Sequence, residues 1–144
     1  MGSFQREREL VATNDPTAYL AAPEAMGILG EWGFSAIVSY IHRLAWDAGA
    51  LLTNRWGTML DAPREMIGSM VTVPLPEAAG ATDEDAARLR VALLVEDRIE
   101  VQLHAWRGRL WVRVSAQVYN DLADIERLAA AVERRIGARR TRQA

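Results

Sequence analysis

The chain of 144 residues is long enough for one domain with its own core, and half of its residues are apolar, which excludes general disorder. A net charge of −2 gives no general attraction to nucleic acid or to anionic lipid. Cysteine is absent and the only histidines are His42 and His104, so thiolate chemistry is excluded and a histidine-rich zinc site is not expected. The N-terminus is charged where a signal peptide would be apolar, and no stretch has the apolar length of a membrane span, so we expect a cytoplasmic protein.

The first predicted element is a helix that starts at Asp15-Pro16, because Asp is a good N-cap and proline suits the first helical position. Pro23 lies inside this helix, and Gly33 is its expected end. A second helix is predicted to follow at once, with Ser35 as its cap. Its apolar stripe steps by three or four residues toward Arg55 and comprises Ile37, Ile41, Leu44, Ala48 and Leu51.

The segment Met70–Pro74 predicts a strand, because it is mostly β-branched or apolar and ends at proline. Thr82 then predicts the N-cap of a helix to about Glu96, with three acids in the first turn, where the helix dipole favours negative charge. The apolar face expected for this helix comprises Leu89, Leu93 and Leu94.

Alternation of apolar and polar residues predicts two strands, at residues 99–105 and from Leu110 onward, joined by a tight turn at Gly108. Trp106 and Trp111 flank this turn and are expected to hold the two strands together. A last helix is predicted from an N-cap at Asn120 to Gly137. Its apolar stripe comprises Leu122, Ile125, Leu128, Val132 and Ile136.

The order helix, helix, strand, helix, strand, strand, helix predicts an α+β fold in which helices cover a small sheet. We expect residues 1–60 to form a leading segment with two helices, residues 61–138 the α+β domain, and residues 139–144 a frayed, arginine-rich tail.

Arg113 is the strongest candidate for a ligand-binding residue. It lies on a predicted strand, on the face opposite Val112 and Val114, and a polar loop follows it. A guanidinium held on a strand can bind a carboxylate through two parallel hydrogen bonds, although a solvated arginine is the commoner reading of such a position. Thr13, just before the first helix, places a hydroxyl where phosphate is favoured, and a threonine in a turn is the simpler alternative.

Other polar residues have structural interpretations. His42 lies beside the apolar stripe of the second helix, where a packed histidine is commoner than a catalytic one. The C-terminal arginines are explained by a helix end that favours cations more simply than by phosphate contacts to nucleic acid. They are Arg134, Arg135, Arg139, Arg140 and Arg142.

Two stretches together resemble a known family. "FQRERELVATNDPTAYLAAPEAMGILGEWG" and "LWVRVSAQVYNDLADIERLAAAVE" are similar to the C-terminal portion of class V aminotransferase-fold, pyridoxal-phosphate enzymes, most closely the isopenicillin N epimerase-like branch. In that family the first motif typically reads "GT.D" before a helix, and the second reads "RiS.q.YN". The similarity covers nearly the whole chain but only about the last third of a family member.

The resemblance implies the C-terminal small domain of a fold-type I enzyme, with Thr13 on the cofactor phosphate and Arg113 on the α-carboxylate of an amino-acid substrate. Ala12 and Asn14 depart from the family pattern next to Thr13. The resemblance gives Tyr119 and Asn120 no ligand role; we expect packing and helix capping from them.

Every basic side chain of this chain is an arginine. The lysine that forms the Schiff base with pyridoxal phosphate is therefore missing, and guanidinium cannot replace it, because it stays protonated. We expect a large-domain chain, within a homo- or hetero-oligomer, to supply the lysine. No catalytic or metal-binding residue is predicted in this chain.

Three functions remain open at this stage. The first is a split subunit or fragment of an enzyme that acts on amino acids by epimerisation, transamination or carbon–sulfur cleavage. The second is a non-catalytic remnant or interaction module that binds a partner through an apolar surface. The third, a nucleic-acid-binding domain that uses the arginine tail, is the weakest, since acidic residues share the same helix.

Overall fold

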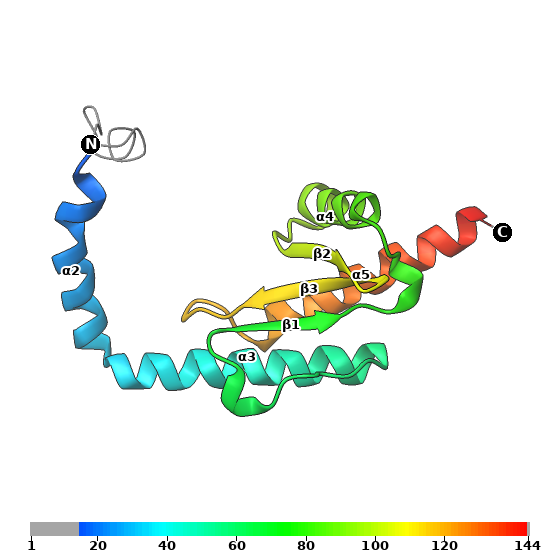
Figure 1. The fold of residues 1–144 in the computed structure, drawn as a ribbon. Helices are drawn as coiled ribbons and strands as arrows, with labels where there is room; N and C mark the ends of the chain where they lie inside the picture. The colour runs from blue at the N-terminus through cyan, green and yellow to red at the C-terminus, as the bar shows by residue number, and fades with distance from the viewer. Residues whose placement is uncertain (1–14, 144) are drawn as a thin grey trace, which may run out of the picture. The chain divides into compact units, whose positions relative to one another are not determined.

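A computed structural model describes the backbone of residues 15–143 and the side chains of residues 15–138. Its elements follow the predicted order (Figure 1). They are α2 (Thr17–Trp32), α3 (Phe34–Trp56), the 3-10 turn η1 (Arg64–Met66), β1 (Met70–Pro74), the 3-10 turn η2 (Glu77–Ala79), α4 (Asp83–Asp97), β2 (Gln102–Trp106), β3 (Arg109–Ser115) and α5 (Leu122–Gln143). The chain divides into two compact units, residues 1–36 and residues 37–144. Among the described helices, none combines the length and the apolar character needed to cross a bilayer.

Helix α2 begins one residue later than predicted. Pro16 occupies the cap position, and the Asp15 carboxylate accepts a hydrogen bond from the backbone N–H of Thr17 at 3.0 Å. The helix ends at Gly33, as predicted, with a φ of 85° that favours glycine. No residue of α2 is buried, so its apolar side chains gain little from burial within this chain.

Helix α3 begins at Phe34, so the expectation that Ser35 caps it was wrong. The N–H of Ala36 donates to the carbonyl of Gly33 at 2.9 Å, which lets the helix start directly after the turn. The second half of α3 enters the core of the larger unit. Its buried residues include Leu44, Ala45, Ala48 and Leu52.

The three strands form an antiparallel sheet in the order β1-β3-β2. A two-residue turn joins β2 to β3, and both of its residues have positive φ, 49° at Arg107 and 73° at Gly108. This conformation is typical of a type I′ hairpin turn, whose twist matches that of the strands. Trp106 and Trp111 hold the hairpin together as predicted. Their rings meet edge-on with centroids 5.3 Å apart, and the Trp111 indole N–H donates to the Trp106 carbonyl at 3.0 Å.

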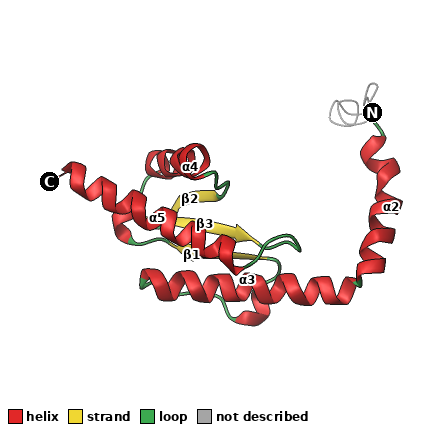
Figure 2. Ribbon diagram, turned by 180° about the vertical axis from the view of Figure 1, so that it is seen from behind, coloured by secondary structure: helices red, strands yellow, loops and turns green. Residues whose placement is uncertain are grey.

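The core lies on one face of this sheet. Leu103, Val112 and Val114 point to that face and are buried, as the alternation predicted. Helices α3, α4 and α5 contribute residues to this core. Figures 1 and 2 show these helices and the sheet from opposite directions. The opposite face carries exposed residues, among them Met70, Thr72, Gln102, His104, Arg113 and Ser115. Arg113 is thus on the open face of the sheet.

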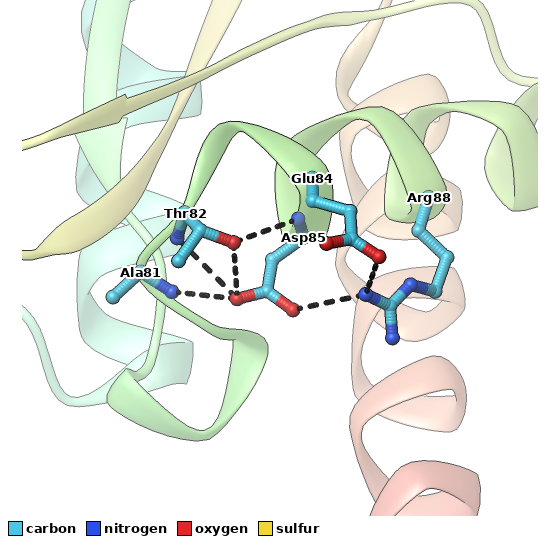
Figure 3. Close-up of polar contacts among 5 residues, drawn as sticks. All are labelled: Ala81, Thr82, Glu84, Asp85 and Arg88. Carbon is cyan, nitrogen blue, oxygen red and sulfur yellow. Dashed lines mark hydrogen bonds and ion pairs between the residues drawn. The ribbon is translucent and has the colours of Figure 1, made fainter.

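Helix α4 starts with a capping box. The Thr82 hydroxyl accepts a hydrogen bond from the N–H of Asp85, and the Asp85 carboxylate accepts hydrogen bonds from the N–H groups of Thr82 and Ala81 (Figure 3). Leu89 and Leu93 are buried as predicted. Leu94 is 48% exposed, so its assignment to the buried face was wrong; Ala86 is buried there instead.

Helix α5 differs from the prediction at both ends. Asp121, rather than Asn120, caps it, because its carboxylate accepts hydrogen bonds from the N–H groups of Ala123 and Asp124. The helix does not end at Gly137 but continues to Gln143. Glycine lowers helix propensity by about 1 kcal/mol without blocking a helix, and the helical residues that follow Gly137 outweigh that cost.

Candidate functional site

Arg113 lies on the central strand β3, between two residues of neighbouring strands. Thr72 of β1 and Gln102 of β2 are its direct cross-strand partners. Side chains directly opposite each other in an antiparallel pair share one face of the sheet, with Cβ atoms about 4.5–5.5 Å apart. All three side chains are exposed, so the guanidinium stands on the open face between two uncharged hydrogen-bonding groups.

Within the described part of the chain, the Arg113 guanidinium makes no hydrogen bond or ion pair. Several other arginines form ion pairs or hydrogen bonds within the chain. Arg55, for example, binds Glu133 at 2.8 Å, and Arg109 donates to the carbonyl of Leu75 at 3.0 Å. A free guanidinium on a rigid central strand keeps its paired donors available for a carboxylate from outside the chain.

Arg113 is one of the residues that line a shallow cleft of about 320 Å³, formed by the segment that enters β2, the end of β3 and the first half of α5. Its apolar lining comprises Ile99, Val101, Val114, Ile125 and Leu128, and its polar lining comprises Glu100, Gln102, Arg113, Ser115, Asn120 and Asp124. This volume is at the small end of ligand sites, which suits a compact molecule. The lining carries one cation, Arg113, and two carboxylates, Glu100 and Asp124.

The loop after β3 is held in place by Asn120. Its side-chain oxygen accepts a hydrogen bond from the N–H of Gln117, its amide donates to Asp124 at 3.2 Å, and its carbonyl accepts one from the Tyr40 hydroxyl at 2.6 Å. Asn120 therefore fixes one wall of the cleft rather than capping the helix. Tyr119 is 82% exposed, so the expectation that it packs against Asn120 was wrong.

Thr13, the residue expected to contact the cofactor phosphate, lies outside the described residues. The described residues do not form a site for pyridoxal phosphate by themselves. The chain has no lysine, and side-chain acceptors already occupy the first N–H groups of α4 and α5, where a phosphate would otherwise bind.

Other candidates have structural roles in the described region. His42 is half-buried on α3. No group of three or more metal-binding side chains comes together within that region. Arg134 and Arg135 lie within α5 and pair with the Asp97 carboxylate at the end of α4, at 3.0 and 2.8 Å. These two arginines join α5 to α4 through ion pairs, whereas the sequence suggested that they lie at a helix end where the dipole favours positive charge.

Sequence reasoning missed Gln102 as a residue of this site. The signal was present: a two-residue turn at Arg107 and Gly108 pairs Trp106 with Arg109, and counting back along both strands pairs Gln102 with Arg113. Thr72 could not have been found in this way, because no local rule fixes the register of β1 against β3.

Comparison with curated proteins gives relatives of two kinds. The chain is 33% identical over 143 residues to a protein of Oryza sativa subsp. japonica provisionally named L-cysteine desulfhydrase 1, and 33% identical over 144 residues to L-cysteine desulfhydrase of Arabidopsis thaliana. It is 34% identical over 131 residues to isopenicillin N epimerase of Streptomyces clavuligerus. The chain is homologous to part of each of these proteins.

The matches cover 86%, 88% and 89% of this chain but only 30%, 32% and 31% of the three relatives. The chain thus spans about a third of the length of the curated relatives it matches. No protein-family model matches it. The relatives agree with the resemblance noted from the two sequence motifs, and they include both desulfhydrases and an epimerase.

Proposed function

We propose that this chain supplies the substrate-carboxylate site of a pyridoxal-phosphate enzyme that acts on an amino acid. The observation that carries the proposal is the Arg113 guanidinium on the open face of the sheet, beside a cleft and without a partner among the described residues. The homologues support an amino-acid substrate, since they are named for L-cysteine and isopenicillin N. In this proposal the reaction is carbon–sulfur cleavage or epimerisation, which both require that the substrate be oriented by its carboxylate.

The proposal gives Arg113 a binding and orienting role. The guanidinium holds the carboxylate through charge-assisted hydrogen bonds and so fixes the direction in which the rest of the substrate points. The cofactor supplies the electron sink for bond breaking at the α-carbon. The lysine that anchors the cofactor lies outside this sequence, because these 144 residues contain none. The cofactor phosphate is contacted in part by Thr13.

The test is reconstitution with a chain that carries the missing lysine, encoded by a neighbouring reading frame. We expect the co-purified pair to bind pyridoxal phosphate and to be yellow. Arg113→Ala should raise the KM for the amino acid at least about 10-fold, the effect of losing a charged hydrogen-bonding partner, while the colour remains. Arg90→Ala, which removes an exposed arginine of α4, is the matched control and should leave KM unchanged. A colourless pair, or an unchanged KM in Arg113→Ala, would refute the proposal.

A second candidate function is favoured by α2. This helix has no buried residue, and its exposed side chains include Tyr19 (76%), Leu20 (75%), Met26 (72%) and Trp32 (61%). Scattered apolar residues on a surface are ordinary, but a whole helix with none buried favours a partner surface. A remnant that acts only through this helix would bind its partner with Arg113 replaced by alanine and would lose the partner when Leu20 and Met26 are replaced by serine.

A further inference from the structure

The carboxylate site of the proposed function contains a second candidate ligand, the side chain of Gln102. Gln102 is the direct partner of Arg113 across the β2–β3 pair, on the same exposed face. It also lines the same cleft as Arg113, whereas the partner on the other side, Thr72, is not among the cleft-lining residues. A ligand in the cleft therefore meets Arg113 and Gln102 together.

The chemistry of the two side chains is complementary to a carboxylate. Arginine presents a planar fork of donors that matches the two carboxylate oxygens, and the glutamine amide adds donors without adding charge. Within the described residues the Gln102 side chain makes no hydrogen bond or ion pair, so its amide is as free as the guanidinium. Because glutamine is neutral, it adds no further negative charge to a cleft that Glu100 and Asp124 already line.

We propose that Gln102 is a substrate-recognition residue that donates a hydrogen bond to the carboxylate bound by Arg113. This proposal rests on the proposed function, because it adds a donor to the same site. It restricts the preferred substrates to those whose carboxylate can reach the Gln102 and Arg113 side chains together, on the exposed face of the sheet.

The experiment uses the full chain labelled with nitrogen-15 and propionate as the probe. Propionate should shift the side-chain resonances of both Arg113 and Gln102, and uncharged propionamide should not. Gln102→Ala should weaken propionate binding about 3- to 10-fold, as expected for one exposed hydrogen bond to a charged group. Gln102→Glu should weaken it more than Gln102→Ala does, because the new carboxylate lies opposite Arg113 and competes for it.

His104→Ala is the matched control. His104 lies on the same strand and face, but it faces Trp111 and is not among the residues that line the cleft. Its replacement should leave the dissociation constant unchanged, and circular dichroism should show every variant folded, since the replaced side chains are exposed. Equal affinities in wild type and Gln102→Ala, with binding lost in Arg113→Ala, would overturn the role of Gln102 alone. If Arg113→Ala also bound propionate normally, the proposed function would fail as well.

Discussion

Replacement of Asp85 by alanine tests whether the start of α4 stabilises the fold. Asp85 is only 9% exposed, and its carboxylate oxygen accepts three hydrogen bonds: from the N–H of Ala81 at 3.1 Å, from the N–H of Thr82 at 3.3 Å and from the Thr82 hydroxyl at 3.0 Å (Figure 3). Arg88 approaches the other carboxylate oxygen at 3.6 Å. Alanine keeps the helix propensity but removes all of these contacts.

The expected loss follows from the partners of the carboxylate. A hydrogen bond to a charged group contributes about 1.5–3 kcal/mol when both partners are buried. Ala81 and Thr82 are exposed, so water can bind their N–H groups when the carboxylate is removed. We therefore take the loss of stability as about 1 kcal/mol for each of the two backbone hydrogen bonds. The lost interaction of a negative charge with the helix N-terminus adds about 0.5 kcal/mol. We therefore expect Asp85→Ala to lower the free energy of unfolding by about 2–3 kcal/mol.

Urea denaturation followed by circular dichroism measures this loss as a lower midpoint at constant slope. Arg88→Ala is the control, because the Arg88 side chain is 60% exposed and its ion pairs should contribute less than about 0.5 kcal/mol. If Asp85→Ala were no more destabilised than Arg88→Ala, the capping box would not be the feature that stabilises this end of α4.

Three further predictions concern the helices. Gly49→Ala should destabilise the protein by about 1–2 kcal/mol despite its better helix propensity, since the new Cβ would lie 2.9 Å from a methyl carbon of Val71. Gly137→Ala should stabilise it by about 0.5–1 kcal/mol, because the added Cβ meets no described atom within 4 Å outside its own stretch of helix, and α5 continues through this position. Burial alone would raise the pKa of Asp97, but hydrogen bonds from Arg135 and a second arginine hold that pKa below its ordinary value. Asp97→Asn should therefore lower the urea midpoint at pH 7, and this difference from the wild type should shrink as the pH falls through the lowered pKa that Asp97 has in the folded protein, because the wild-type carboxylate then takes up a proton.

Each of these predictions has a clear contrary result. A stabilised Gly49→Ala would mean that α3 and β1 are not in close contact. A destabilised Gly137→Ala would mean that α5 ends at this glycine, as the sequence alone suggested. For Asp97→Asn, a loss of stability that does not shrink as the pH is lowered would show that packing, and not charge, holds α4 to α5.

Local signals predicted most of the elements correctly. Pro74 and the β-branched run before it bounded β1, Thr82 capped α4, and the alternation around Gly108 gave the β2–β3 hairpin. These signals succeed because the preferences of caps, turns and strand faces act over a few residues. The prediction placed Arg113 correctly on the exposed face of a strand for the same reason.

Two of the errors fall where the packing of other elements decides and local preference does not. Gly137 was expected to end a helix, yet Arg134 and Arg135 bind Asp97 on α4, which holds this part of α5 in place. Leu94 fitted the apolar stripe of α4 but remains exposed, since Ala86, Leu89 and Leu93 already fill the contact with the sheet. Periodicity shows which residues share a helix face but not how much of that face another element covers.

The sequence by itself determined the order of the elements, the exposed position of Arg113 and the absence of any lysine to anchor pyridoxal phosphate, because these depend on residue types and local geometry alone. Only the tertiary structure decided that Thr72 and Gln102 flank Arg113, that the guanidinium is unpaired in the described region, and that a cleft opens beside it. Strand register and the burial of α5 residues in the core join residues far apart in the chain, and such pairings are fixed by the burial of the whole core rather than by any one segment.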